Sequence, residues 1–259
     1  MSVAGAVRTT RPLRIGQIVP SSNVTMETEI PALLNAHADH TGDVSFTFHS
    51  SRMRMKTVSH DELVAMDRDS DRCALELSDA HVDVMGYACL VAIMATGHGY
   101  HRRSAERLHQ LTVDNGAPAP VVTSAGALVD GLHALGATTI ALIAPYMRPL
   151  TDLVVDYIAA EGVTIQDSLA LEIPDNLEVA AQDPNNLIEH VAKVDVAGVD
   201  AVVLSACVQM PSLSAVPAVE DALGVPVLSA AIATTWQMLV HLGRPTVAPA
   251  AGALLSGQY

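Results

Sequence analysis

The chain has 259 residues, half of them hydrophobic, which is enough for a large core and for two lobes of about 100–150 residues each. It carries 14 lysines and arginines against 28 aspartates and glutamates, a formal charge of −14. This balance argues against nucleic acid and anionic membrane surfaces as partners, because both are bound through clustered basic side chains.

Cysteine usage and the start of the chain indicate a cellular compartment. Three cysteines without a C-x-x-C pair suit a reduced cytosolic protein. Residues 1–12 lack the apolar core of a signal peptide and are expected to form a loose tail. No apolar run approaches the ~18 residues of a membrane span. The sequence therefore predicts a soluble, cytoplasmic protein.

The first half of the chain alternates predicted strands with predicted helices. A strand over 13–19 ends at the turn 20–23, where Ser22 or Asn23 caps the next helix and Glu27 and Glu29 suit its dipole. The elements expected after it are a strand over 44–50, a helix over 60–79 capped by Ser59, a strand in the apolar run 82–94, a helix over 100–114, a strand over 120–123 and a helix over 125–135. Cys73 lies on the apolar stripe of its helix and is expected to be an inert core thiol.

The second half repeats this alternation. The expected elements are a strand over 138–144, a helix over 149–160, an extended segment over 163–173, a helix over 184–195, a strand in the apolar run 199–211, a helix over 212–223, a strand over 225–229 and a helix over 231–242. Such regular alternation predicts an α/β fold with parallel sheets.

Three pairs of segments recur in the same order in the two halves. VDVMGYACL, with Cys89, matches VDAVVLSACV, with Cys207; IGQIVP matches IALIAP; and VTSAGA matches VLSAAI. We therefore expect two pseudo-symmetric lobes, each a parallel sheet flanked by helices. The N-terminal lobe would comprise 13–123 plus 228–259 and the C-terminal lobe 124–227.

Cys89 and Cys207 are the candidate catalytic residues. Each lies where a buried strand gives way to a helix, and parallel sheets bind ligands beyond the carboxyl ends of their strands. A thiolate is a good nucleophile whose pKa falls near backbone donors. The alternative is a pair of buried, inert thiols, although matched positions in a duplicated fold favour one shared pocket.

Three further residues follow strand ends at proline-containing turns: Asn23, Tyr146 and Asn176. Their amide and phenol groups can donate hydrogen bonds to a substrate carboxylate. The alternative is that Asn23 only caps a helix and Asn176 only makes a turn.

The spacing of His98 and His101 invites a metal site, but no cysteine or acidic side chain lies at ligand spacing. No G-x-G-x-x-G or G-x-x-x-x-G-K-[ST] motif is present, so nothing in the sequence favours a nucleotide. Arg52 and Arg54 can face the cleft or form surface ion pairs.

The chain resembles the maleate cis-trans isomerases of the aspartate/glutamate racemase superfamily over about 14–255. The resemblance rests on VPSSNVTMETEIP, SRMRM, YACLV, SAGAL, APYMRP and CVQMPSL. It implies that Cys89 adds to the double bond of maleate, that the central bond turns, and that Cys207 supplies and removes the proton before fumarate leaves.

The resemblance also implies that Asn23, Tyr146 and Asn176 hold the carboxylates and that apolar walls, including Leu90, Val91 and Val208, keep water from the adduct. It implies no metal, no organic cofactor and a homodimer. Two departures from the pattern are His98 in the glycine-rich turn and Ala206 before the second cysteine.

Other functions stay open from the sequence. A racemase of an amino acid or hydantoin would use the same two cysteines to exchange an α-proton. A decarboxylase of substituted malonates would need one of them. A non-catalytic protein that binds small acids would need neither as a reactive group.

Overall fold

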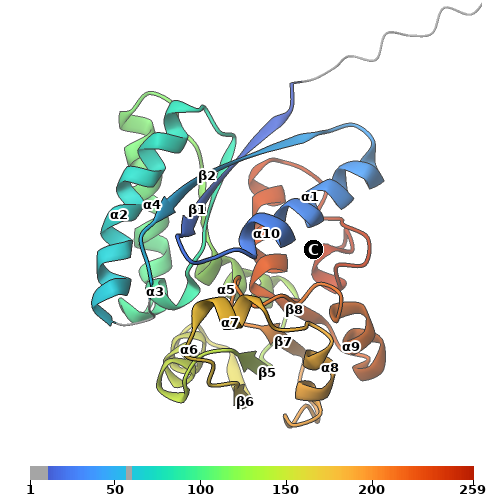
Figure 1. Ribbon diagram of the computed structural model, residues 1–259. Helices are drawn as coiled ribbons and strands as arrows, with labels where there is room; N and C mark the ends of the chain where they lie inside the picture. The colour runs from blue at the N-terminus through green and yellow to red at the C-terminus, as the bar shows by residue number, and fades with distance from the viewer. Residues whose placement is uncertain (1–10, 57–59) are drawn as a thin grey trace, which may run out of the picture.

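The computed structural model describes residues 11–56 and 60–259, which form two four-stranded sheets in an α/β architecture (Figure 1). The strands are β1 (Leu13–Pro20), β2 (Phe46–Met53), β3 (Val84–Tyr87), β4 (Val121–Thr123), β5 (Thr139–Ala144), β6 (Thr164–Ala170), β7 (Ala201–Ser205) and β8 (Val227–Ser229). One sheet has the order β2-β1-β3-β4 and the other β6-β5-β7-β8, and all paired strands are parallel. The predicted fold class is confirmed.

Helices cover both sheets. They are α1 (Met26–Thr41), α2 (His60–Asp79), α3 (Leu90–Ala95), α4 (Tyr100–Asp114), α5 (Ser124–Ala134), α6 (Arg148–Ala160), α7 (Asn176–Ala180), α8 (Asn186–Val191), α9 (Val216–Leu223) and α10 (Ala230–His241), followed by the 3-10 turn η1 (Ala253–Leu255). In the first lobe α2 and α4 lie on one face of the sheet, and α1 and α10 lie on the other. Within the described residues, no helix combines the length and apolar character of a membrane span.

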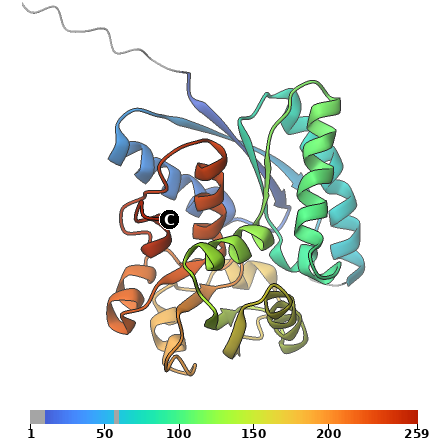
Figure 2. The same cartoon turned by 180° about the vertical axis from the view of Figure 1, so that it is seen from behind.

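The two sheets are equivalent in topology, as the internal repeat predicts. In each lobe the first strand is central, the third precedes a cysteine, and the fourth runs directly into a helix. The two helices that follow the fourth strands, α5 and α10, pack side by side between the sheets (Figure 2). The interior strands are buried on both faces, which is why they consist of apolar runs without alternation.

The apolar run 82–94 is not one strand. β3 ends at Tyr87, Cys89 adopts a left-handed conformation (φ 101°, ψ 76°), and the remaining residues form α3. Leu90, Val91, Ile93 and their neighbours in α3 are buried on all sides. A run without polar interruption does not distinguish a strand from a buried helix, so the sequence pattern missed the change.

Several other boundaries differ from the prediction. The segment 174–195 contains two short helices, α7 and α8, in place of one helix over 184–195. β2 continues to Met53 and α9 begins only at Val216. The predicted cap Ser59 and residues 1–10 of the predicted tail lie outside the described residues, whereas Arg11 is tied to Asp83 by two hydrogen bonds of 2.8 and 2.6 Å.

Two residues of the first lobe show how the core is closed. Cys73 is fully buried among apolar side chains, as predicted, and burial raises the pKa of its thiol. Glu29 lies in the first turn of α1, as predicted. It is buried and accepts hydrogen bonds from the backbone N–H groups of Ser212 and Leu213, at 2.6 and 3.0 Å. This carboxylate therefore joins α1 to the segment before α9.

The C-terminal segment provides a test of the packing. Gly252 has φ +75°, and a Cβ there would lie 2.6 Å from the Val227 carbonyl oxygen. Glu220 Oε2 joins the segments around Val227 and Gly252 by accepting hydrogen bonds from the N–H groups of Val227 and Ala253. Backbone cannot yield as a flexible side chain can, so the segment must shift if a methyl group is added.

We expect Gly252→Ala to lower the free energy of unfolding by about 2–3 kcal/mol, from backbone strain plus overpacking. Gly243→Ala is the matched control, because Gly243 also has positive φ (+61°) but open space around its Cα. It should cost only the strain, about 1 kcal/mol. Urea denaturation of both variants measures the difference, and equal losses would contradict the clash.

Candidate active site

The carboxyl ends of the central strands from both lobes meet at one enclosed pocket. Pro20 ends β1, Cys89 follows β3, Tyr146 follows β5, and Cys207 follows β7. The pocket is lined by Pro20, Asn23, Met55, Cys89, Leu90, Val91, Tyr146, Asn176, Cys207, Val208 and Gln209. All eight predicted site residues are therefore brought together, and Pro20, Met55 and Gln209 are additions.

The pocket is small and uncharged. Its cavity is about 20 Å³, room for roughly one water molecule. No charged side chain is among its lining residues, so every polar group that a ligand could meet there is a neutral amide, phenol, thiol or peptide group.

Cys89 occupies a strained position at the start of α3. Its positive φ is rare for a residue with a side chain and places the thiol at a sharp strand-to-helix turn. Burial raises the pKa of this thiol to about 12, although the nearby Ala92 N–H group favours the thiolate. The ionised forms of Cys207 and Asp67 would oppose its charge. Cys89 is therefore a neutral thiol at neutral pH in the unliganded site.

Cys207 lies beyond β7 and is 9% exposed. Burial raises its pKa as well, while the Tyr146 hydroxyl and the N–H groups of Gln209 and Met210 act in the opposite direction. The Tyr146 hydroxyl also lies 3.2 Å from the Ala206 carbonyl oxygen. Because one O–H donates one hydrogen bond at a time, this phenol can change partner when charge develops in the pocket.

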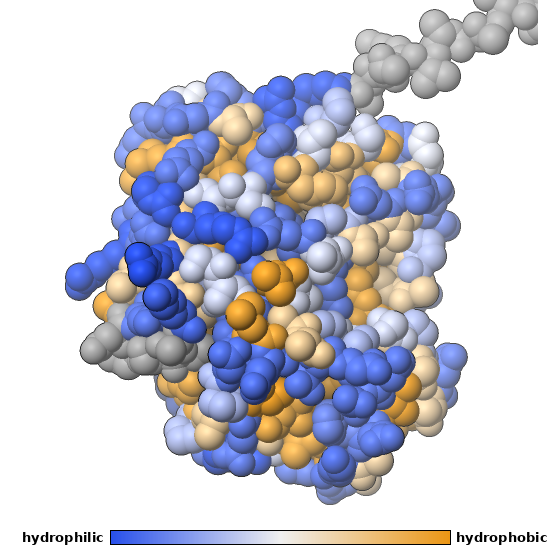
Figure 3. Space-filling view, in the orientation of Figure 1, coloured by the Kyte–Doolittle hydropathy of each residue, from blue (hydrophilic) through white to orange (hydrophobic). Residues whose placement is uncertain are grey.

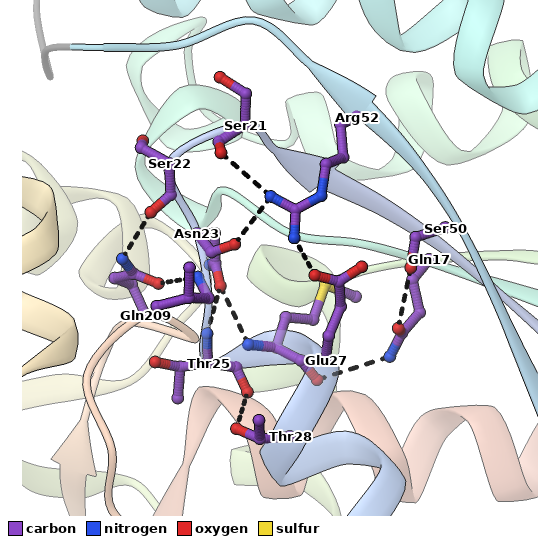
Figure 4. Close-up of polar contacts among 12 residues, drawn as sticks. Gln17, Ser21, Ser22, Asn23, Thr25, Glu27, Thr28, Ser50, Arg52 and Gln209 are labelled. Carbon is purple, nitrogen blue, oxygen red and sulfur yellow. Dashed lines mark hydrogen bonds and ion pairs between the residues drawn. The ribbon is translucent and has the colours of Figure 1, made fainter.

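Asn23 lines the pocket and also makes hydrogen bonds at the start of α1 (Figure 4). Its Oδ1 accepts hydrogen bonds from the N–H groups of Thr25 and Met26 at 3.0 and 2.9 Å. The N-cap residue of α1 is Thr25, so the predicted cap at Ser22 or Asn23 is placed too early, although Asn23 still binds N–H groups at the start of the helix. With Oδ1 held by the helix, the Nδ2 amide group is the end left for a ligand.

Gln209 ties this turn to the second lobe. Its Oε1 accepts from the Val24 N–H group at 2.9 Å, and its Nε2 donates to the Ser22 carbonyl oxygen at 2.9 Å (Figure 4). Nε2 also donates to the Asn176 carbonyl oxygen at 2.7 Å. Asn176 Nδ2 donates to Ser22 Oγ at 2.8 Å. The side chain of Gln209 is almost fully buried. The feature of the sequence that points to Gln209 is its place two residues after Cys207.

Arg52 holds the outer side of the same turn and does not line the pocket. Its Nη1 donates to the carbonyl oxygens of Ser21 and Asn23 at 3.0 and 3.2 Å, and its Nη2 pairs with Glu27. Arg54 lines a separate surface cavity beside Asp69. Of the two predicted roles of Arg52, ion pairing is therefore the one that the structure shows.

The two histidines of the H-x-x-H motif have different partners. His98 Nε2 lies 2.8 Å from an Asp156 carboxylate oxygen at the surface, and His101 Nδ1 lies 2.5 Å from the Tyr157 hydroxyl. Across residues 11–56 and 60–259, no group of three or more histidine, cysteine or acidic side chains is arranged to hold a metal ion. His98 joins the turn before α4 to α6, outside the pocket.

Comparison with known proteins agrees with this geometry. The family model described as arylmalonate decarboxylase matches residues 15–255. A maleate isomerase of Pseudomonas putida is 65% identical over 250 residues, covering 96% of this chain and all of that protein.

Two crystal structures are similar over almost the whole chain. A maleate isomerase of Pseudomonas putida, a cysteine-to-alanine variant with maleate, has a TM-score of 0.94 and 62% identity, covering 96% of this chain and 99% of its own. A maleate cis-trans isomerase of Nocardia farcinica, a cysteine-to-serine variant with a covalently bound succinylcysteine intermediate, has a TM-score of 0.92 and 47% identity, covering 96% and 100%. The chain belongs to the maleate isomerases, within the family that the arylmalonate decarboxylase model describes.

Proposed function

We propose that this protein isomerises maleate to fumarate, with Cys89 as nucleophile and Cys207 as proton donor and acceptor. The observation that carries the proposal is the pairing of two thiols, one from each lobe, in a closed pocket without charged side chains. The crystal structures of relatives with maleate and with succinylcysteine support the same chemistry.

The double bond of maleate does not rotate, but a single bond does. In the proposed first step Cys89 gives its S–H proton to a carboxylate of the bound substrate, and its sulfur bonds to one alkene carbon. The π electron pair moves toward the carboxylate on the other carbon. The Cys207 S–H then gives its proton to that second carbon, which completes a succinyl adduct. The central carbon–carbon bond, which is single in the adduct, then rotates.

The return half of the reaction restores the enzyme. The Cys207 thiolate removes the proton that it gave, the electron pair re-forms the double bond, and the Cys89 sulfur leaves as a thiolate. This thiolate takes back its proton from the carboxylate that received it, so both cysteines are thiols again. Electrons and protons balance without a redox partner. This is general acid–base catalysis combined with covalent catalysis.

The neutral donors explain how a dianion can be attacked. Charge that moves onto a carboxylate during addition needs donors already in position, and each such donor is typically worth about 3–4 kcal/mol. We assign this role to the amide of Asn23, the hydroxyl of Tyr146 and the side chain of Asn176, all of which line the pocket. Leu90, Val91 and Val208 line its apolar walls and exclude water from the adduct.

Both thiols are protonated at rest, so the Cys89 thiolate must form together with substrate binding. The carboxylates of the bound substrate are the bases that can accept the Cys89 proton, because no charged side chain lines the pocket in the described part of the chain. A thiol that ionises only when the pocket is filled is protected from oxidation and alkylation between turnovers.

Three finer points belong to the same proposal. We infer a homodimer in the cytoplasm, on the strength of the family resemblance and of the reduced cysteines. We also infer a lobe division at residues 123/124 and 227/228; the packing of α10 against β3 supports the assignment of 228–259 to the first lobe. Sedimentation velocity tests the dimer.

The proposed roles of the cysteines can be separated by substitution. Cys89→Ser should lower turnover of maleate by about 10³-fold or more, since the nucleophile is lost. Proton NMR of the purified, reduced protein with maleate in D2O measures both fumarate formation and deuterium incorporation. Cys73→Ala is the control and should retain activity. A fully active Cys89→Ser variant would refute the mechanism.

Alkylation tests the resting state of Cys89. With a pKa near 12, the thiolate fraction rises about tenfold per pH unit throughout the neutral and mildly alkaline range. The rate constant for modification of Cys89 by iodoacetamide, followed by peptide mass spectrometry, should therefore climb between about pH 7 and 9.5 without a plateau. A plateau below pH 8 would show that the free enzyme holds a thiolate.

Gln209 is expected to act as a positioning residue. Gln209→Leu removes two hydrogen bonds between the lobes and a third to Asn176, and should lower kcat/KM by about 10²-fold through displacement of the two asparagines. Gln110→Leu, on the exposed face of α4, is the matched control. Steady-state kinetics well below the melting temperature provide the measurement. Equal kinetics of both variants would contradict the positioning role.

A further inference from the structure

An acidic protein that acts on a dianion must attract it locally. The net charge of −14 repels maleate at long range, and the catalytic pocket has no charged side chain to oppose this. Steering of a charged substrate therefore requires cationic groups close to the opening of the site.

A second cavity lies directly outside the catalytic pocket. Its walls include Ser21, Ser22, Met55, Lys56, Asp175 and Asn176, and its volume is about 330 Å³, against about 20 Å³ for the catalytic cavity. Met55 and Asn176 line both cavities, so these two side chains form the partition between them. Figure 3 shows this face of the molecule, where polar and apolar side chains are mixed around the region in which the β1–α1 turn meets α7.

The segment that follows β2 carries a basic side chain, Lys56, to this outer cavity. Beyond Arg52 the chain alternates, with Met53 and Met55 turned into the core and Arg54 and Lys56 exposed. Arg52 is occupied by Glu27 and by turn carbonyl groups. Arg54 and Lys56 both line a neighbouring cavity beside Asp69 and Glu62, and of these two only Lys56 also lines the outer cavity. Lys56 is thus the basic side chain at the outer cavity.

Among the described residues that line the outer cavity, the one acidic side chain, Asp175, already has hydrogen-bond partners. Asp175 Oδ1 accepts hydrogen bonds from the N–H groups of Leu177 and Glu178, at 2.7 and 3.0 Å, and caps α7. Its charge is therefore partly compensated by the helix terminus. The Ser21 hydroxyl donates to the Met55 carbonyl oxygen, so the Ser22 hydroxyl and Lys56 are the groups that favour an anion.

We propose that this outer cavity is a capture site for the dicarboxylate, with Lys56 as the charge that attracts it before Met55 and Asn176 admit it to the cysteines. The proposal rests on the proposed function and adds a binding step to it. A carboxylate held beside Lys56 would keep most of its water, since the cavity is open to solvent at the protein surface. The substrate then moves into the catalytic pocket, from which water is excluded.

The chain contains its own control, because Lys56 and Lys193 are its two lysines. Lys193 is exposed at the end of α8, beside His190, and lines neither cavity. Lys56→Gln and Lys193→Gln therefore change the net charge equally at different places, and Lys56→Glu doubles the change at the mouth of the site.

We expect Lys56→Gln to lower kcat/KM for maleate about threefold to tenfold at low ionic strength, with kcat almost unchanged. Lys56→Glu should lower it further. The difference from Lys193→Gln should shrink when the ionic strength rises from about 0.01 M to about 0.1 M, because the Debye length falls from ~30 to ~10 Å.

Steady-state kinetics of the full-length protein at several salt concentrations distinguish the outcomes. Equal kcat/KM and equal salt dependence for Lys56→Gln and Lys193→Gln would overturn the capture site and leave the isomerase activity standing. A fall in kcat instead of kcat/KM would also overturn it, since Lys56 would then act on the bound substrate. Failure of the unsubstituted protein to convert maleate would overturn both proposals.

Discussion

The burial of two cysteine thiols in one uncharged pocket sets the conditions for the rest of the site. Burial keeps Cys89 protonated, with a pKa of about 12, and raises the pKa of Cys207 as well. The same exclusion of water strengthens every hydrogen bond that a neutral donor makes to developing charge. The same water-excluding pocket therefore keeps the thiol unreactive in the free enzyme and favours reaction once the substrate is bound. The charge needed to ionise the thiol arrives with the substrate.

Such a pocket lies between lobes, so its geometry depends on contacts that join them. Gln209 links the turn after β1 to the loop that carries Asn176, and Glu29 links α1 to the segment before α9. Both side chains are buried, and both satisfy backbone groups that would otherwise lack partners inside the protein. The two asparagines are therefore positioned as one unit with Cys207, although they belong to opposite lobes. Two-lobed duplication supplies the matched thiols, and these bridging polar groups supply their relative placement.

The sequence carries much of this arrangement. Strand-ending prolines, the two Ala-Cys junctions and the repeated order of segments predict the two sheets and the residues that meet between them. What the sequence does not reveal is conformation inside uniform apolar stretches: α3 follows Cys89 without any polar signal, because all its residues are apolar and Leu90 to Met94 are buried. The roles of Gln209 and Glu29 are equally hidden, since a hydrogen bond across 180 or so positions leaves no local pattern. Local spacing places Glu29 in the first turn of α1 correctly but does not reveal its hydrogen bonds to Ser212 and Leu213.

The central claim is that Cys89 forms the covalent adduct while Cys207 handles the proton. The most direct test is mass spectrometry of the Cys207→Ser protein after incubation with maleate. Our account predicts a mass increase equal to one maleate, located on the peptide that contains Cys89, and no such increase when Cys89 is also replaced. An adduct on a different residue, or no adduct under conditions in which the unsubstituted protein produces fumarate, would contradict it.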